Sequence, residues 1–450
     1  MKWEHLFSKK RLGREDRPYS SLSRTEFQRD IDRIVFSSPF RRLQNKTQVV
    51  PLPDSDHVRN RLTHSIETAS VGRSIGTLAG EALTGKYPDI FNALEVHDTD
   101  LGALVSAACL AHDLGNPPFG HSGEDAISAY FQNGPGYDMI RECTPEQKYD
   151  LQHFEGNASG FRLLTSTGEA QSDLKGGLGL TYTTLAAFSK YPKQSLPELK
   201  KDKKASSKKY GFFQTEKEVF AKVADELNLR SKKGPYCWNR HPLAFLVEAA
   251  DDICYHIIDF EDGFNLDIIA FETIEKLYIE ILGSNWQKFE GRYKKIYDEG
   301  SCVRYLRSLA INRLIQESAK VFIDNEKEIL NGTFDKPILS QLPMISTLKE
   351  IIDISINKCY RHRNVLEIEA AGFEVMSGLL DAFVPSIING NSLKNDKIIQ
   401  LYPQQYLSKK GKAFEDPYLN MINAVMFISS MTDNYALKLF KKIKGISLYQ

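Results

Sequence analysis

Side chains that can bind a metal ion or transfer a proton are concentrated between residues 112 and 124. His112 and Asp113 follow an apolar run, a Gly-Asn-Pro-Pro turn comes next, and His121 and Glu124 come after it. Burying an imidazole and a carboxylate at the end of an apolar helix costs free energy unless another group compensates for them. A divalent metal ion or a simple ion pair could do so, and this stretch alone leaves both alternatives open.

Two other segments carry residues of the same kinds. His64 lies in the middle of a helical pattern. A second helix, predicted over residues 243–260, places Asp251, Tyr255 and Asp259 on one face, because they are spaced by four residues. On an otherwise apolar helix, this polar stripe indicates a functional site and not only contact with solvent.

Two imidazoles and two carboxylates from these segments form the metal site that we predict. Its ligands are His64, His112, Asp113 and Asp251. Asp252 competes for the last position, but Asp251 is favoured because it shares a helix face with Tyr255 and Asp259. A mixed nitrogen and oxygen set without thiolate suits Mg2+ or Mn2+, with Fe2+, Zn2+ or Ni2+ as alternatives.

The motifs resemble, in their sequences and in their order along the chain, those of the deoxyguanosine triphosphate triphosphohydrolases, a family of HD-domain metal-dependent phosphohydrolases. The four predicted ligands follow an H…HD…D pattern that is only moderately specific by itself. The sequence segments around these residues make the match close. They are RDIDRIVFSSPFRRLQNKTQV, RLTHSIE, HDLGNPPFGHSGE, HFEGN, the FSKYP and KKYGFF pair, and EAADDICYHIIDFEDG. The resemblance covers residues 29–263 strongly and residues 360–375 more weakly.

His121 and Glu124 are three residues apart, so the carboxylate can hold the imidazole in one tautomer. Histidine titrates near neutrality and can act as a general acid or base. The resemblance implies that this pair serves the hydrolytic step, with His121 protonating the departing nucleoside 5′ oxygen and Glu124 orienting it. The alternative is a histidine that only packs against the turn.

A triphosphate requires cationic side chains, and the family motifs suggest which ones. The expected phosphate contacts are Arg61, Lys190 with Tyr191, and Lys209, with Lys208 as an equal alternative to Lys209. Asn116 and His153 are expected to line the phosphate pocket. Tyr255 is expected to press against the sugar, where its ring would leave no room for a 2′ hydroxyl. Gln48 and Asp259 are expected to hydrogen-bond to the sugar.

Helical patterns dominate the chain, and the predicted fold class is all-α. We expect an N-terminal arm over residues 1–28, loosely packed, and an HD phosphohydrolase core over residues 29–265. Within the core, a basic insertion over about 168–235 would contain a small β-hairpin at residues 170–182. Residues 266–450 are expected to form a helical region that packs on the core and on neighbouring subunits.

The bulk composition points to no special class of partner. The chain has 450 residues, 58 Lys and Arg, and 58 Asp and Glu, so its formal net charge is zero. Its six cysteines are scattered without a Cys-x-x-Cys pair, which favours a reducing compartment. The N-terminus lacks the apolar core of a signal peptide. The apolar stretch at residues 101–111 is shorter than the about 17–25 residues that span a bilayer. We therefore expect a cytoplasmic protein without a membrane partner.

The expected function is metal-dependent hydrolysis of a deoxynucleoside triphosphate, with dGTP as the leading substrate implied by the resemblance. One alternative is an HD-type nucleotidase or phosphodiesterase, and another is a protein that senses dNTPs or single-stranded nucleic acid without turnover. The basic stretch KKDKKASSKK keeps nucleic acid open as a partner, although a solvated surface loop is the favoured explanation. The resemblance also implies a homo-oligomer, such as a hexamer, and a dNTP as an allosteric effector.

Overall fold

The computed structural model describes residues 1–16, 24–48, 59–166, 176–195, 206, 208–390 and 392–446. Within these ranges the secondary structure is helical apart from isolated bridges, so the all-α prediction is confirmed. The first half contains α1 (Glu26–Val35), α2 (Ser38–Arg42), α3 (Arg61–Lys86), α4 (Pro88–Leu94), α5 (Asp98–Ala111), α6 (His121–Gln132), α7 (Pro145–Gln152), α8 (Gly156–Thr165), α9 (Tyr182–Phe188), α10 (Lys217–Glu226) and α11 (Pro242–Asn265).

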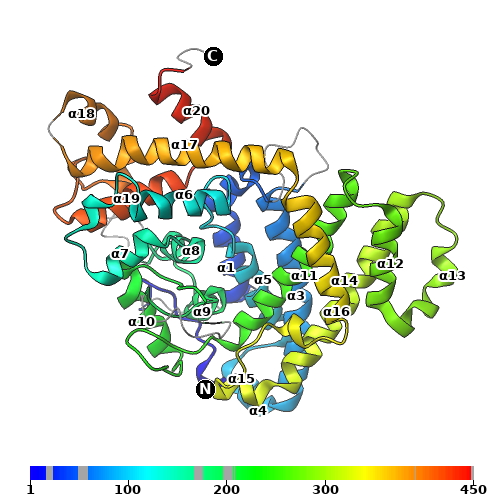
Figure 1. Ribbon diagram of the computed structural model, residues 1–450. Helices are drawn as coiled ribbons and strands as arrows, with labels where there is room; N and C mark the ends of the chain where they lie inside the picture. The colour runs from blue at the N-terminus through cyan, green and yellow to red at the C-terminus, as the bar shows by residue number, and fades with distance from the viewer. Residues whose placement is uncertain are drawn as a thin grey trace.

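The second half is helical as expected (Figure 1). It contains α12 (Phe271–Leu282), α13 (Glu290–Tyr293), α14 (Glu299–Asp324), α15 (Glu326–Asn331), α16 (Ile345–Ile354), α17 (Arg363–Ile388), α18 (Leu393–Ile399), α19 (Pro417–Ser429) and α20 (Asp433–Ile443). The sequence pattern at residues 418–444 predicts a single helix, but the structure forms two there. Thr432 starts the second one, because its side chain accepts a hydrogen bond from the Tyr435 amide.

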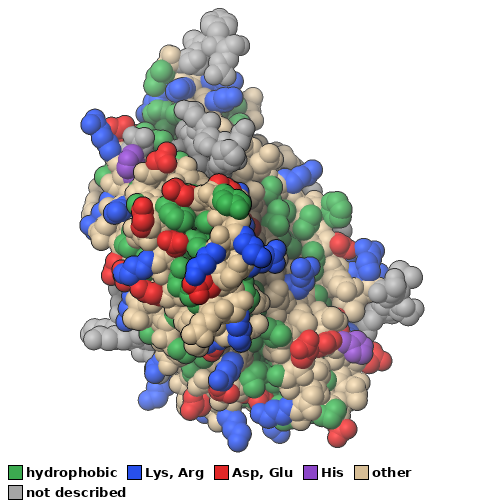
Figure 2. All heavy atoms as spheres, turned by 90° about the vertical axis from the view of Figure 1, so that its right-hand side faces the viewer, with side chains coloured by type: hydrophobic (Ala, Val, Ile, Leu, Met, Phe, Trp, Pro, Cys, Tyr) green, Lys and Arg blue, Asp and Glu red, His purple; other side chains and the backbone are tan. Residues whose placement is uncertain are grey.

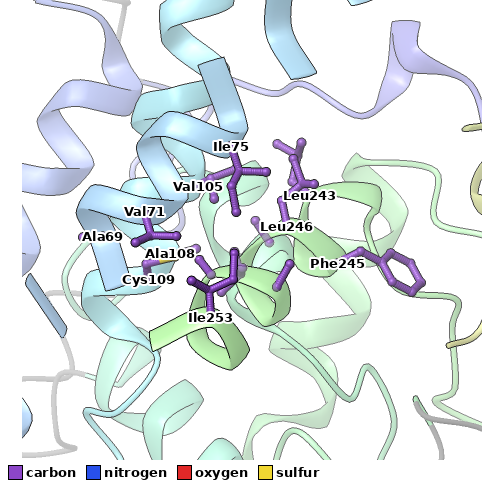
Figure 3. Packing of buried hydrophobic residues seen from close by; sticks show 14 of the residues in the cluster. Ala69, Val71, Ile75, Val105, Ala108, Cys109, Leu243, Phe245, Leu246 and Ile253 are labelled. Atoms are coloured by element: carbon purple, nitrogen blue, oxygen red, sulfur yellow. The ribbon is translucent and has the colours of Figure 1, made fainter. Parts of the chain in front are cut away.

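Three helices, α3, α5 and α11, form the centre of the larger hydrophobic core (Figure 3). Side chains such as Ile75, Val105 and Leu246 meet between them and are fully buried. Glycines on α3 allow close contact with α5: a Cβ at Gly76 would lie 2.8 Å from the Leu101 carbonyl oxygen. This tight packing fixes the relative positions of the polar residues on the same three helices.

A second hydrophobic cluster joins the C-terminal helices to α6 and α7. Ile127 of α6 belongs to it together with Leu379 of α17 and Val425 of α19. Figure 1 shows α17 running across the top of the molecule beside α6 and α19. The segment Val365–Ile388 within α17 is long and apolar enough to cross a bilayer by length and composition, but 56% of its window is buried inside the protein.

The N-terminal residues are packed more tightly than predicted. Trp3 is 3% exposed, contacts the Phe91 ring, and donates a hydrogen bond from Nε1 to Glu326 at 2.7 Å. Arg11 forms buried ion pairs with Glu26 at 2.6 Å and with Asp30. The expectation of a loose arm is therefore wrong for residues 1–16. Residues 1–16 are mostly polar, but the few large apolar side chains among them are buried in the hydrophobic core.

The hairpin predicted at residues 170–182 is not found in the part that the structure describes. Residues 170–175 lie outside the described ranges, and residues 176–182 contain only an isolated bridge between Thr181 and Arg11. Gly176, Gly177 and Gly179 have positive φ angles, so the glycines form turns rather than strands. Most of the basic stretch at residues 200–209 is also outside the described ranges. The predicted division of the chain into domains stays a prediction.

Charges of both signs alternate on the surface at the end of the molecule that carries α12 and α13. Figure 2 shows Lys and Arg side chains interspersed with Asp and Glu on this face. This agrees with a formal net charge of zero and gives no single-sign surface on that side.

Candidate active site

Three core helices bring an imidazole pair and a carboxylate together. His64 comes from the second turn of α3, His112 follows the last residue of α5, and Asp251 lies in the middle of α11. The Asp251 Oδ1 atom lies 3.2 Å from His64 Nε2 and 3.4 Å from His112 Nε2. Ligand atoms of the three residues all lie within 4.8 Å of one another, a grouping that could hold a metal ion.

The chemical state of His112 fits a metal ligand. Its Nδ1 atom lies 2.6 Å from the Cys109 carbonyl oxygen, so in the neutral imidazole Nδ1 carries the hydrogen and Nε2 presents a lone pair to a cation. His112 Nε2 is buried and has no hydrogen-bond partner. A buried nitrogen without a partner costs free energy, and a cation would remove that cost. The residues present therefore fit a divalent metal ion.

Asp113 is held differently from the other three predicted ligands. Arg61 Nη1 donates to its Oδ2 at 2.8 Å, and Asn116 Nδ2 donates to its Oδ1 at 2.5 Å. Oδ1 lies 3.5 Å from His112 Nε2. The ligand role of Asp113 stays a prediction, while the two donors fix its carboxylate beside the imidazoles.

Opposite charges set the protonation states in this group. Desolvation opposes the charged form of His112, but Asp113 and Asp251 outweigh it and raise its pKa to about 9. The Arg61 guanidinium and the imidazoles hold the pKa of Asp113 at about 2 against the effect of burial. The imidazoles likewise hold the pKa of Asp251 well below its usual range. Both carboxylates are thus ionised and able to accept a cation.

Asp251 rather than Asp252 reaches the imidazoles, as the helix-face argument predicted. Burial raises the pKa of Asp252 to about 7, with Lys190 opposing the shift and Glu248 adding to it. The pKa values of the two neighbouring carboxyl groups are therefore shifted in opposite directions, because the groups face different side chains.

His121 and Glu124 form a hydrogen-bonded pair at the start of α6. His121 Nδ1 lies 2.9 Å from Glu124 Oε2, and the Gly156 amide donates to Glu124 Oε1 at 2.8 Å. Gly120, with φ of 58°, lets the chain turn sharply before the helix. The hydrogen bond that His121 donates to Glu124 raises the pKa of His121. The His121 side chain is 85% exposed, so it is open to a substrate, whereas Glu124 is buried.

A cavity of about 570 Å3 connects the two groups and collects nearly all of the predicted residues. Those that line it are Gln48, Arg61, His64, His112, Asp113, Asn116, His121, Glu124, Lys190, Tyr191, Lys209, Asp251, Tyr255 and Asp259. Its size lies within the range of about 300–1,000 Å3 that small-molecule sites occupy. Lys209 lines the cavity and Lys208 does not, which favours Lys209 of the two alternatives.

His153 is the exception among the predicted residues. It does not line the cavity but follows α7, where its ring packs 4.3 Å from the Tyr149 ring centroid. The sequence pattern at residues 145–166 predicts one helix, but the backbone leaves the helical region at His153 and α8 starts at Gly156.

The basic side chains in the cavity are paired with carboxylates. Lys190 Nζ lies 3.2 Å from Glu248, and Lys209 Nζ lies 3.0 Å from Glu155. Glu248 also accepts a hydrogen bond from Arg240 at 2.7 Å. The pairs hold the ammonium groups at the cavity wall, where an anionic ligand could contact them.

Tyr360 is a cavity residue that sequence reasoning did not assign. Its ring stacks on the Tyr255 ring with centroids 5.8 Å apart and planes 8° apart, and its hydroxyl donates to Asp259 Oδ2 at 3.1 Å. Asp259 is buried, which raises its pKa to about 7. Tyr360 is the first residue of the segment 360–375, whose sequence resembles the family only weakly. That weak resemblance was the one sequence feature that could have indicated a role for Tyr360 in the site.

Comparisons with known proteins find relatives along the whole chain. A deoxyguanosinetriphosphate triphosphohydrolase-like protein of Synechocystis is 41% identical over all of both chains. A protein of the same name from Pseudomonas aeruginosa is 35% identical over 99% of each chain. The deoxyguanosinetriphosphate triphosphohydrolase of Salmonella paratyphi A is 31% identical over 80% of this chain and 76% of its own. A scan against models of protein families finds no match.

Proposed function

Because the chain belongs to the deoxyguanosinetriphosphate triphosphohydrolase family, we propose that it hydrolyses deoxynucleoside triphosphates to deoxynucleoside and inorganic triphosphate. The observation that carries the proposal is the single cavity that joins His64, His112 and Asp251 to the His121–Glu124 pair. We propose dGTP as the leading substrate, since the names of the relatives specify it. We also propose that the core is of the HD type and that the reaction depends on a divalent metal.

His64, His112, Asp251 and, as we propose, Asp113 would hold the metal ion. Such an ion polarises a phosphate oxygen and orients water for attack at the α-phosphorus. The ligand set suits Mg2+ or Mn2+ first.

His121 is the group that we assign to the leaving oxygen. Water forms a new bond to the α-phosphorus while the bond from that phosphorus to the nucleoside 5′ oxygen breaks. His121 gives its proton to the 5′ oxygen, and Glu124 keeps the imidazole protonated and oriented. The proton lost by the attacking water passes to solvent and His121 is reprotonated for the next turnover.

The triphosphate would lie against Arg61, Lys190 and Lys209. Each of these cations already contacts a carboxylate of the protein, so a phosphate oxygen would compete with or share that contact. Asn116 would contribute a further polar contact next to Asp113.

The sugar would lie on the face formed by Tyr255, with Gln48 and Asp259 as hydrogen-bonding partners. Gln48 Oε1 and Asp259 Oδ1 are both buried and have no partner, so each can accept a hydroxyl hydrogen from a ligand. We expect Tyr255→Ala to reduce the preference for dGTP over GTP by about tenfold, the value of one modest contact. Equal selectivity of the variant and the parent protein would remove Tyr255 from this role.

Product analysis tests the reaction. The protein is incubated with each dNTP and Mg2+ or Mn2+, and products are identified by chromatography and phosphorus NMR. Tripolyphosphate and deoxynucleoside are expected. Diphosphate with deoxynucleoside monophosphate would identify attack at another bond, and absence of turnover with every dNTP would favour a sensing protein.

A further inference from the structure

A second cavity lies between α2, α8 and α19, apart from the catalytic one. Its volume is about 200 Å3, and no residue lines both cavities. Its polar lining includes Arg42 of α2, Arg162 of α8, Asn423 of α19 and Tyr406, which follows α18 in the chain. Nothing in the proposed hydrolysis uses these residues.

Arg42 is half-buried and, unlike the fully buried arginines among the described residues, has no acidic partner. Arg11, Arg61, Arg162 and Arg240 are buried, and each of them contacts a carboxylate. Among the described residues, Arg42 contacts none, and its one hydrogen bond goes to the Ser38 hydroxyl at 3.3 Å. Burial lowers the pKa of its guanidinium, which is the effect expected of a cation without a counter-ion.

The Tyr406 hydroxyl provides a second polar group without a partner. Tyr406 is only 6% exposed, and its oxygen is buried without a hydrogen bond. A buried hydroxyl that makes no hydrogen bond costs free energy unless a ligand or water satisfies it. The Arg42 guanidinium can only donate hydrogen bonds, and the Tyr406 hydroxyl can also donate one. A ligand group that satisfies both must therefore be a hydrogen-bond acceptor.

The other walls limit what that acceptor can be. Arg162 is already neutralised by Glu216, and its Nη2 donates to Asn423 at 2.8 Å, so these side chains are committed to each other. Pro39, Leu163, Leu178 and Met426 give the cavity apolar sides. A volume of about 200 Å3 is below the range of about 300–1,000 Å3 for drug-sized ligands. A nucleoside triphosphate is therefore too large, whereas a phosphate ion or a compact phosphate ester is of suitable size.

We propose that Arg42 and Tyr406 form a second binding site for a phosphate-type oxyanion, separate from the catalytic cavity. A guanidinium binds phosphate through two parallel hydrogen bonds, and the phenol supplies a third donor. The site adjoins the segments that hold the catalytic turn. Arg42 is four residues before Lys46, whose Nζ donates to the carbonyl oxygens of Ser429, at 2.8 Å, and of Asn116.

Direct titration with inorganic phosphate tests the proposal and needs no turnover, so it stands apart from the test of the hydrolytic reaction. The full chain is titrated by calorimetry at constant ionic strength, with chloride replacing phosphate in the reference. Because phosphate could also bind the catalytic cations, all variants are made in a Lys190→Gln, Lys209→Gln background. We expect one phosphate site to remain in that background.

Three variants locate that site. Arg42→Gln is expected to weaken phosphate binding at least about tenfold, and Tyr406→Phe about threefold, in keeping with one charged and one neutral hydrogen bond. Arg41→Gln is the matched control, because Arg41 is the exposed neighbour that carries the same charge and does not line the cavity; it is expected to bind like the parent. Thermal melting confirms folding, and Tyr406→Phe, which removes one oxygen, keeps the test decisive if Arg42→Gln does not fold.

Two results would overturn the proposal. One is the absence of phosphate binding at millimolar concentration once Lys190 and Lys209 are replaced. The other is equal weakening by Arg41→Gln and Arg42→Gln, which would indicate a general effect of surface charge.

Discussion

Two clusters of titratable side chains in this protein differ in what surrounds the central carboxylate. Asp251 faces the imidazoles of His64 and His112 and the cavity. Asp150, at 0% exposure, receives hydrogen bonds from neutral donors, which include the Tyr418 hydroxyl and the Gln214 amide. The pKa of Asp251 lies well below its usual range, whereas burial raises that of Asp150 to about 7.

The difference shows that burial of a carboxylate does not by itself make a site. Desolvation outweighs the hydrogen bonds and raises the pKa of Asp150 to about 7, so this carboxyl acts as a structural hydrogen-bonding group that joins α7 to α19. Converging imidazoles keep Asp251 ionised and leave ligand atoms close together. Four predictions test this contrast, from the largest expected effect to the smallest.

Replacing Asp251 should remove metal binding. We expect Asp251→Ala to weaken the affinity for Mn2+ by more than about 100-fold, since loss of even an outer partner of a ligand costs about 10–100-fold. Asp252→Ala is the control, because that carboxylate neighbours Lys190 rather than the imidazoles. Calorimetric titration with Mn2+ measures both, and equal losses in the two variants would contradict the assignment.

Replacing His121 should stop the chemistry and leave the metal site intact. We expect His121→Ala to lower kcat by about 10²–10⁴, the usual contribution of a general acid, with unchanged Mn2+ affinity. His153→Ala should have a small effect, because that imidazole lies outside the cavity. Steady-state kinetics on the two variants would contradict this placement if the losses were similar.

Glu124→Gln should move the pH profile. The hydrogen bond to Glu124 raises the pKa of His121, and a general acid is active below its pKa. Without the negative charge the pKa falls, so His121 loses its proton at lower pH. The alkaline limb of kcat should shift to lower pH in the variant, and an unmoved limb would show that another group donates the proton.

Asp150→Asn should affect stability and not turnover. The pKa of Asp150 is raised to about 7 in the folded protein, so its contribution to stability is present below the unfolded pKa and is lost as pH rises through about 7. The unfolding free energy of the parent should therefore decline between about pH 4 and pH 7 by about 3 kcal/mol more than that of the variant, because each unit of pKa shift corresponds to about 1.4 kcal/mol. Urea denaturation at several pH values measures this, and parallel declines would exclude Asp150 as the cause.

The relative positions of residues on one helix face, or within one turn, were predictable from the sequence. The spacing of Asp251, Tyr255 and Asp259 follows from helix geometry alone, and all three line the cavity. The short distance between His121 and Glu124 likewise follows from their separation of three residues. The family motifs supplied Arg61, Lys190 and Lys209, whose place in the cavity depends on segments far apart in the chain.

Other features depend on how distant segments pack and were not predictable. The chain breaks between α7 and α8 at His153, and that imidazole does not line the cavity. The contact between Tyr255 and Tyr360 joins residues more than 100 positions apart, and periodicity along the chain does not specify it. The tight N-terminal packing and the absence of the hairpin from residues 176–182 were missed for the same reason.

The sequence alone determined the helical fold class and the set of metal and acid–base candidates, because helical periodicity and side-chain chemistry act over a few residues. The tertiary structure alone decided which carboxylate stays ionised, which lysine lines the cavity and where Arg42 and Tyr406 meet. Charge state and pairing depend on the groups that surround a side chain in space, and those groups come from helices that are remote in sequence.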